Sequence, residues 1–297
     1  MVKYKHIVTE DEVGLTVHEL LRKNFRFSSR FRTKIKFNSL VDLNGNVSPG
    51  YIRPKAGDII SIRLPEERSD FLPEDIPLDV LFEDEDLLIL NKQSGVVVHP
   101  TKGHPSHTIA NGLMKYMDDT NQTFKIRFAN RIDMDTTGII VVAKNSNVQN
   151  DISNQMKNGL VVKKYLAIVH GRVEKDHFKI NLPIGRPSQE SICRAVMKNG
   201  GKDAVSEIKV LSRFNEYSFI EITLHTGRTH QIRVHLSHIG HPIIGDELYD
   251  GSTELIQRQA LHAYRIEFIH PVTQKEIIIE AGMPTDMKSI IKTMTSD

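Results

Sequence analysis

The sequence predicts an α+β protein of two domains, a small N-terminal module followed by a larger mixed domain. The chain has 297 residues, about twice the length typical of one domain. Helix-like and strand-like apolar patterns occur on both sides of residues 65–77, which are rich in proline and acidic residues and show no apolar period. We therefore assign residues 1–65 to the first domain, 66–78 to a linker and 79–297 to the second domain.

The N-terminal module combines a helical pattern with short strands. Apolar residues between 15 and 21 recur at helical spacing. Asn44 and Gly45 mark a tight turn, and a final strand is expected at 59–64. A module of this size has room for binding but little room for chemistry.

The second domain opens with strands expected at 80–82 and 87–90, paired across the acidic turn 83–86. Residues 138–143 are apolar at every position, which predicts a strand buried on both faces. A helix is expected to follow at 147–158.

The remaining elements follow from the same patterns. A strand is expected at 161–169, and residues 220–224 alternate between apolar and polar, as in a half-buried strand. Helical spacing then resumes, with Thr229 as the expected N-cap and Gly240 as the stop. A strand at 277–280 is expected to close the domain.

Charge is unevenly distributed along the chain. The whole chain carries a formal charge of only +2, but residues 1–65 hold 12 Lys and Arg against 6 Asp and Glu, a net +6. Residues 66–86 hold 10 acidic residues and one Arg. A basic module suits a phosphate backbone, although a merely solvated surface is the alternative.

The composition excludes several classes of protein. The single Cys193 rules out an internal disulfide framework and a cysteine-based zinc site. The first residues have no apolar core, so no secretory signal is expected. The longest aliphatic runs, such as 139–143, are far shorter than the roughly 20 residues of a membrane span. We expect a cytoplasmic protein without a membrane partner.

The first segment with chemical potential is the polar loop 130–138, which leads into the buried strand. There Asp133 would be anchored by the core yet face a cleft, and Arg131 could contact a phosphate or stack on a base. Thr136 and Thr137 could hydrogen-bond the carboxylate of Asp133 or the local backbone. A structural turn with a capping aspartate is the alternative.

The second segment, residues 162–171, is a strand that carries Tyr165. A tyrosine hydroxyl can transfer a proton when it lies close to a substrate. The alternative is an ordinary tyrosine of an amphipathic strand.

The third segment, residues 226–236, joins a strand to a helix. Gly227 allows the chain to turn, so that Arg228, Thr229 and the first helical N–H groups meet at one spot. With Arg233 as a second arginine, this spot is suited to binding an anion or a nucleic acid.

A metal site is the alternative role for the histidines of this region. No two of them stand at positions i and i+4 on one helix face, and no acidic or cysteine ligand lies among them, so no metal is expected. The histidines concerned are His230, His235, His238 and His241.

The three segments, in this order and at these distances, resemble the signature of the RluA-type pseudouridine synthases. That family carries an Arg-Leu-Asp-x-x-Thr-Ser-Gly core, a Lys-x-Tyr-x-Ala-x-Val-x-Gly strand and a Gly-Arg-Thr-His-Gln-Ile-Arg-Val-His helix start. Residues 91–100, 182–186 and 240–246 resemble further family segments, so the resemblance covers about 79–282. This chain departs conservatively from the pattern, which leaves the loop conformation and the target base open. The departures are Gln93, Asn130, Ile132 and Thr137.

The resemblance implies a catalytic domain with a mixed, mainly antiparallel central sheet flanked by helices and loops. It also implies a reaction without a cofactor, in which Asp133 is the nucleophile and Arg233 keeps it ionised. Tyr165 would stack on the flipped uracil and move a proton, and Arg131 would fill the space that the base leaves. The other substrate-binding residues would be Thr136, Thr137, Arg228, Thr229, His230 and Gln231.

The N-terminal module resembles the S-four RNA-binding domain, named from a ribosomal small-subunit protein. The matching features are Ser28-Ser29-Arg30, the stretch 41–47 and Gly57-Asp58. Its basic residues would contact RNA, namely Arg30, Arg32, Lys34 and Lys36.

The expected partner is therefore structured RNA, ribosomal RNA first and transfer RNA second, bound by a monomer. Two other classes were weighed. A non-catalytic RNA-binding or ribosome-assembly factor on the same scaffold would not need to keep Asp133, Tyr165 and Arg233 together. A metal-dependent hydrolase lacks ligands.

Overall fold

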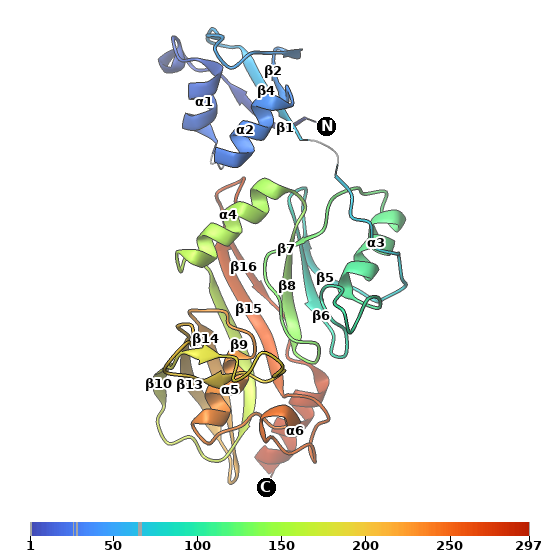
Figure 1. Ribbon diagram of the computed structural model, residues 1–297, viewed down its shortest axis with the longest axis vertical. Coiled ribbons are helices and arrows are strands. Elements are labelled where there is room, and N and C mark those ends of the chain that lie inside the picture. Colours follow the sequence, from blue (N-terminus) through green and yellow to red (C-terminus); the bar gives the residue numbers. More distant parts are fainter. Residues whose placement is uncertain (1, 26, 28, 65–66, 297) are drawn as a thin grey trace.

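The computed structural model describes residues 2–25, 27, 29–64 and 67–296 (Figure 1). Within them, a smaller and a larger sheet have separate apolar cores, and a third sheet has two short strands. The smaller sheet is antiparallel in the order β1-β4-β2-β3 and carries two helices. Its elements are β1 (Val2–Ile7), α1 (Val17–Asn24), α2 (Ser29–Phe37), β2 (Val41–Leu43), β3 (Asn46–Val47) and β4 (Ile59–Arg63).

The larger sheet has ten strands, eight of them in the order β10-β13-β14-β9-β15-β8-β6-β5, with β16 paired to β15 and β7 to β8. All of its pairs are antiparallel except β15 with β8, so the expected mixed, mainly antiparallel α+β architecture is confirmed. A short ladder joins β11 and β12. The strands are β5 (Asp79–Glu83), β6 (Leu87–Lys92), β7 (Arg127–Phe128), β8 (Thr137–Ala143), β9 (Val162–His170), β10 (His177–Asn181), β11 (Ile184–Gly185), β12 (Ala195–Val196), β13 (Val205–Arg213), β14 (Tyr217–Leu224), β15 (Leu261–Ile269) and β16 (Glu276–Glu280). The helices are α3 (Ile109–Asp119), α4 (Ser146–Lys157), α5 (Gln231–His238) and α6 (Thr285–Ser296).

The N-terminal module forms as its sequence predicts. Asn44 and Gly45 both have positive φ, 51° and 85°, which is the geometry of a two-residue hairpin turn between β2 and β3. Thr16 and Glu19 form a capping box that starts α1. Val272 packs against both this module's core and the core beneath α4, so the two domains touch.

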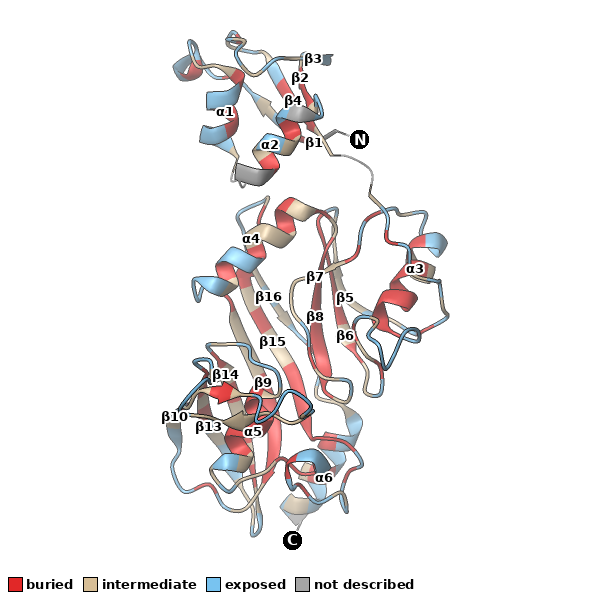
Figure 2. Ribbon diagram, in the orientation of Figure 1, coloured by how far each residue is buried: buried red, intermediate tan, exposed pale blue. Residues whose placement is uncertain are grey.

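The centre of the large sheet is buried on both faces (Figure 2). Every residue of β8 is buried, as predicted for 138–143. On β6, Leu88 and Leu90 belong to the same core as α3, whereas Leu87 and Ile89 belong to the core under α4. Side chains alternate between faces along a strand, so one continuous apolar run can supply two cores.

The neighbouring strands β9, β15 and β8 bring distant segments together. Gly138, at the start of β8, lies against the backbone of β15: a Cβ built there would be 2.2 Å from the carbonyl oxygen of Ala263. Its φ of 111° is also one that residues other than glycine rarely adopt. The loop before β8 is thereby held against the start of β15.

Two details differ from the sequence prediction. The helix of the third segment begins at Gln231, and its N-cap is His230 with φ 58°, not Thr229. Thr229 lies in the turn before the helix, where the Gln231 N–H donates to the Arg228 carbonyl at 3.1 Å, and the first helical hydrogen bond runs from the Val234 N–H to the His230 carbonyl. The strand at 276–280 does not close the domain, because α6 follows it.

The division into domains remains a prediction. Residues 67–78 contain no helix or strand, but Ser69 and Ile76 are buried, so part of this segment packs onto the large domain. Within the described ranges, no helix is both long and apolar enough to cross a membrane.

We predict that Gly138→Ala lowers the free energy of unfolding by about 3 kcal/mol, because the new methyl group must displace backbone and φ is strained. Urea denaturation measures this loss. Gly103→Ala is the matched control, since a Cβ there meets nothing within 4 Å. Equal stability of the two variants would contradict the packing described for Gly138.

Candidate active site

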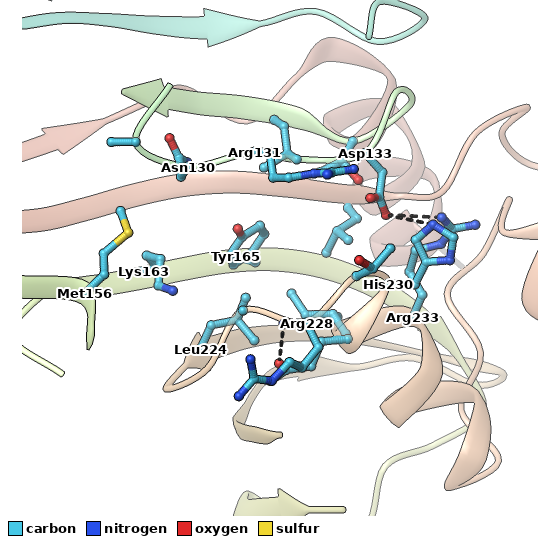
Figure 3. A pocket seen from close by; sticks show the side chains of 18 residues that line it. Asn130, Arg131, Asp133, Met156, Lys163, Tyr165, Leu224, Arg228, His230 and Arg233 are labelled. Carbon is cyan, nitrogen blue, oxygen red and sulfur yellow. Dashed lines mark hydrogen bonds and ion pairs between the residues drawn. The ribbon is translucent and has the colours of Figure 1, made fainter. Parts of the chain in front are cut away.

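A cavity of ≈ 260 Å³ lies where three segments meet: the loop before β8, strand β9, and the turn that starts α5 (Figure 3). Its polar end holds Asp133, His230 and Arg233, and its walls include Tyr165 and Lys163. Pockets for drug-sized ligands are about 300–1,000 Å³, so this cavity suits a smaller group. The three segments singled out in the sequence therefore form one site.

The carboxylate of Asp133 is held by a single arginine. Arg233 Nη1 donates to Asp133 Oδ2 at 3.2 Å, and His230 Nε2 lies 4.0 Å from the same oxygen. Arg233 is itself fixed from behind by Asp246, which accepts from Nε and Nη2 at 2.7 Å each. Within the described residues, Oδ1 of Asp133 accepts no hydrogen bond, so it is available to a reactant.

Arg233 is the cation of the polar end of the cavity. Burial disfavours the charged form of Arg233, but Asp246 and then Asp133 outweigh this and raise its pKa, so the guanidinium is always charged. Asp246 is 1% exposed and therefore depends on this pair for its solvation. Asp246 and Asp133 thus share the buried guanidinium of Arg233, and Asp133 accepts only one hydrogen bond from it.

An aromatic residue completes the support of this arginine. The Arg233 guanidinium lies 5.0 Å from the ring centroid of Tyr249. The Tyr249 hydroxyl lies 2.8 Å from Nδ1 of His230 and accepts the Arg194 N–H at 2.8 Å. Burial lowers the pKa of His230 more than Asp133 raises it, which favours a neutral ring.

Tyr165 stands on β9, between the two ends of the cavity (Figure 3). It is buried, and burial, with the nearby Asp133 charge, raises the pKa of its phenol. The hydroxyl therefore stays protonated near neutral pH. It can donate a hydrogen bond or pack its ring against a base, but it is not a general base in the resting state.

The loop that carries Asp133 is held from beneath by buried side chains. Lys92 is 1% exposed and donates to the carbonyls of Gln93, Val96 and Met134 at 2.7, 3.0 and 2.6 Å. Burial lowers the pKa of Lys92 to about 8, against the opposing effect of nearby carboxylates. Gln259 donates to the Thr136 hydroxyl at 3.1 Å. The loop is therefore rigid where the carboxylate must be aimed.

Most of the predicted substrate-binding residues line the cavity, namely Arg131, Thr136, Arg228, Thr229, His230 and Gln231. Their side chains have different tasks: Gln231 accepts from Thr226 Oγ1 and the Arg228 N–H, and the Arg228 side chain donates to the carbonyl of Asp203. Thr136 and Thr137 do not hydrogen-bond the Asp133 carboxylate.

Thr137 does not line this cavity. Its hydroxyl lies 2.9 Å from Nδ1 of the buried His262, and it lines a different pocket from that of Asp133. It therefore supports the pairing of β8 with β15.

Four residues near the site were not singled out from the sequence: Lys92, Lys163, Asp246 and Tyr249. Lys163 could have been found, because it stands two positions before Tyr165 and so shares its face of the strand. Lys92 and Asp246 lie in stretches that resemble family segments, 91–100 and 240–246, but neither of them was assigned a role from the sequence. Only the fold brings these two and Tyr249 to Arg233 or to the loop.

The histidines of the third segment are engaged in structural bonds. His235 is fully buried between the Ser206 hydroxyl and the Leu182 carbonyl, and His241 lies 2.9 Å from the carbonyl of His170. Elsewhere Asp84, Asp86 and His270 lie together, but His270 Nδ1 accepts two backbone N–H groups, so Nε2 carries the proton that Asp84 accepts. Such a ring has no lone pair for a metal.

The basic residues of the N-terminal module are unequal. Lys36 is exposed, whereas Lys34 pairs with Glu67 at 3.1 Å, and Glu67 also pairs with Arg127 at 2.5 Å. Arg32 donates to the carbonyl of Phe27. The side chain of Arg30 lies outside the described residues.

Comparison with known proteins identifies the family. Residues 86–238 match the family model described as RNA pseudouridylate synthase. A Bacillus subtilis relative, "Uncharacterized RNA pseudouridine synthase YjbO", is 41% identical over 89% of this chain and 94% of its own length. "Ribosomal large subunit pseudouridine synthase D" of Haemophilus ducreyi is 34% identical over 98% of this chain and 94% of its own length.

A solved structure supports the fold alone. The human RNA pseudouridylate synthase domain containing 4 superposes with a TM-score of 0.60 at 21% identity, over 73% of this chain and 93% of that one. The resemblance inferred from the three segments is confirmed, and the reading as a non-catalytic factor is set aside. The chain belongs to the RNA pseudouridine synthase family and is an RNA-modifying isomerase of the RluA type.

Proposed function

We propose that Asp133 is the nucleophile with which this enzyme isomerises uridine, and that no cofactor takes part. The observation that carries this proposal is the arrangement Asp133–Arg233–Asp246 at the end of the cavity. It offers a partly buried carboxylate that shares its counterion with Asp246. A carboxylate is suited to attack a glycosidic carbon with oxocarbenium character.

The reaction divides into two displacements at the ribose C1′. A carboxylate oxygen of Asp133 bonds to C1′ while the C1′–N1 pair of electrons leaves with the uracil. The base then turns, and C5 supplies the electron pair of the new bond to C1′ while the O–C1′ pair returns to the Asp133 carboxylate. C5 loses its proton and N1 takes one up. The product is an isomer, so neither an oxidant nor an energy source is consumed.

The other site residues bind and position the base. The ring of Tyr165 forms the wall on which the everted uracil packs, and its hydroxyl relays a proton. Arg131, which is exposed beside Asp133, takes the place of the base in the RNA stack. Arg228, Thr229, His230, Gln231 and Thr136 shape the surrounding loops and the substrate contacts, whereas Thr137 only supports the pairing of β8 with β15.

We propose large-subunit ribosomal RNA as the substrate, with transfer RNA as the second choice, and a monomeric cytoplasmic enzyme. A relative that matches nearly the whole chain carries the name of a ribosomal large subunit enzyme. The N-terminal module, through Arg30, Arg32, Lys34 and Lys36, adds affinity for the phosphate backbone that depends on salt but little on sequence.

Asp133→Asn should lower the single-turnover rate at least about 10³-fold, because the amide cannot form the bond to C1′. Tritium release from a [5-³H]uridine-labelled large-subunit ribosomal RNA transcript measures the rate. RNA affinity should stay within about threefold. Asp135→Asn removes a carboxylate from the same loop and should lose less than about tenfold; full activity of Asp133→Asn would refute the nucleophile.

Asp246→Asn should lower the same rate more than about tenfold, although residue 246 does not line the small cavity. Loss of its charge leaves Arg233 with Asp133 as its one charged partner, which ties up the nucleophile. Measuring both the rate and the RNA affinity of the variant tests this, because the rate should fall while the affinity does not change. An unchanged rate would show that Asp246 does not position Arg233.

Lys36→Gln should weaken RNA binding and reduce the slope of log affinity against log salt by about 0.7–0.9, the value for one lost phosphate contact. The rate at saturating RNA should be unchanged. Lys288→Gln on α6, also exposed, is the control. Equal slopes for both variants would place the N-terminal module away from the RNA.

A further inference from the structure

Lys163 is a cation without a counterion in the wall of the catalytic cavity. It lies on β9, near Met156 and Asn130, at the end of the cavity opposite Asp133 (Figure 3). Within the described part of the chain, its ammonium has neither a hydrogen-bond acceptor nor a carboxylate partner. By contrast, neighbouring Lys164 pairs with Glu221 at 3.3 Å.

The surroundings of this ammonium are poorly solvated. Burial lowers the pKa of Lys163, and no nearby carboxylate opposes that effect. Gly227 faces it: a Cβ built there would lie 3.7 Å from Nζ, so the absence of a side chain leaves the space beside the ammonium open. A desolvated charge without a partner is costly, and an anionic or strongly accepting ligand would offset that cost.

The position of Lys163 relative to Tyr165 determines which part of a ligand the Lys163 ammonium can reach. Lys163 and Tyr165 share one face of β9 and stand about 6.6 Å apart along the strand. Tyr165 lies between Lys163 and Asp133 (Figure 3). A nucleoside with its sugar at Asp133 and its base on Tyr165 therefore directs the far edge of the base toward Lys163.

We propose that Lys163 donates a hydrogen bond to a carbonyl oxygen of the target uracil and stabilises the negative charge of the detached base. This rests on the proposed role of Asp133. When the C1′–N1 bond breaks, its electron pair stays on the uracil and spreads over N1, O2 and O4, while Asp133 bonds to C1′. An ammonium at a carbonyl edge stabilises that charge, which the bound uridine lacks, and so accelerates the step.

The ammonium of Lys163 could instead pair with a backbone phosphate of the RNA. The two ligands, phosphate and uracil, predict different measured effects. A phosphate is charged before, during and after the reaction, so its partner contributes to binding. The charge on the base exists only during the reaction, so its partner contributes to rate.

The test is the single-turnover rate and the RNA affinity of Lys163→Met, measured with the [5-³H]uridine-labelled large-subunit ribosomal RNA transcript. We expect a rate at least about 10²-fold lower, with affinity and salt slope unchanged. The single-turnover rate of Lys163→Arg should be at least tenfold higher than that of Lys163→Met. In the wild type, the rate should fall at alkaline pH as Lys163 and the buried Lys92 lose their protons, and in Lys163→Arg the part of this fall that is due to residue 163 should be missing.

Lys164→Met is the matched control, since it removes the adjacent lysine from the other face of the strand, and its rate should stay within threefold. If Lys163→Met has poor stability, Lys163→Gln takes its place. Unchanged rate with weaker binding and a salt slope reduced by about 0.7–0.9 would assign Lys163 to a phosphate and overturn the proposal. A rate within threefold of wild type would also overturn it. Wild-type activity in the same assay reports on the proposed function separately.

Discussion

The site depends on one buried guanidinium shared by two carboxylates. Arg233 gives two hydrogen bonds to Asp246 and one to Asp133, so most of its bonding is directed away from the reacting group. A bidentate pair between Arg233 and Asp133 would lower the energy of the carboxylate and cover its oxygens. The observed division keeps Asp133 charged but accessible, which is the condition a nucleophile needs.

The surrounding fold keeps this arrangement in place. Arg233 belongs to α5, Asp133 to the loop before β8, and Asp246 to the stretch between α5 and β15. The contact between these three side chains therefore relies on the order of β9, β15 and β8 in the sheet. The buried Lys92 and the close approach at Gly138 hold the loop to the sheet. Since the sheet is packed on both faces, small displacements are costly, and the carboxylate stays aimed.

The cavity is also polarised along its length. The guanidinium of Arg233 and the carboxylate of Asp133 occupy one end, the protonated phenol of Tyr165 the middle and the unpaired ammonium of Lys163 the other end. This order matches a substrate whose sugar becomes electron-poor and whose base becomes electron-rich as the glycosidic bond breaks. Fixed groups of this kind need no reorganisation when the charge develops.

The sequence by itself determined the architecture, the family and the three segments that meet in the site. A continuous apolar run such as 138–143 predicts a strand that is buried on both faces. The motifs around Asp133, Tyr165 and Arg233 can be recognised because each lies within a short stretch of the chain. Only the tertiary structure decided the roles of Asp246, Lys92 and the hydroxyl of Thr137, which faces away. Their contacts span long stretches of chain, and no local periodicity encodes such a contact. The N-cap at His230 was missed because residues 228–231 form a turn before the helix and His230 takes a positive φ, which no local apolar period encodes.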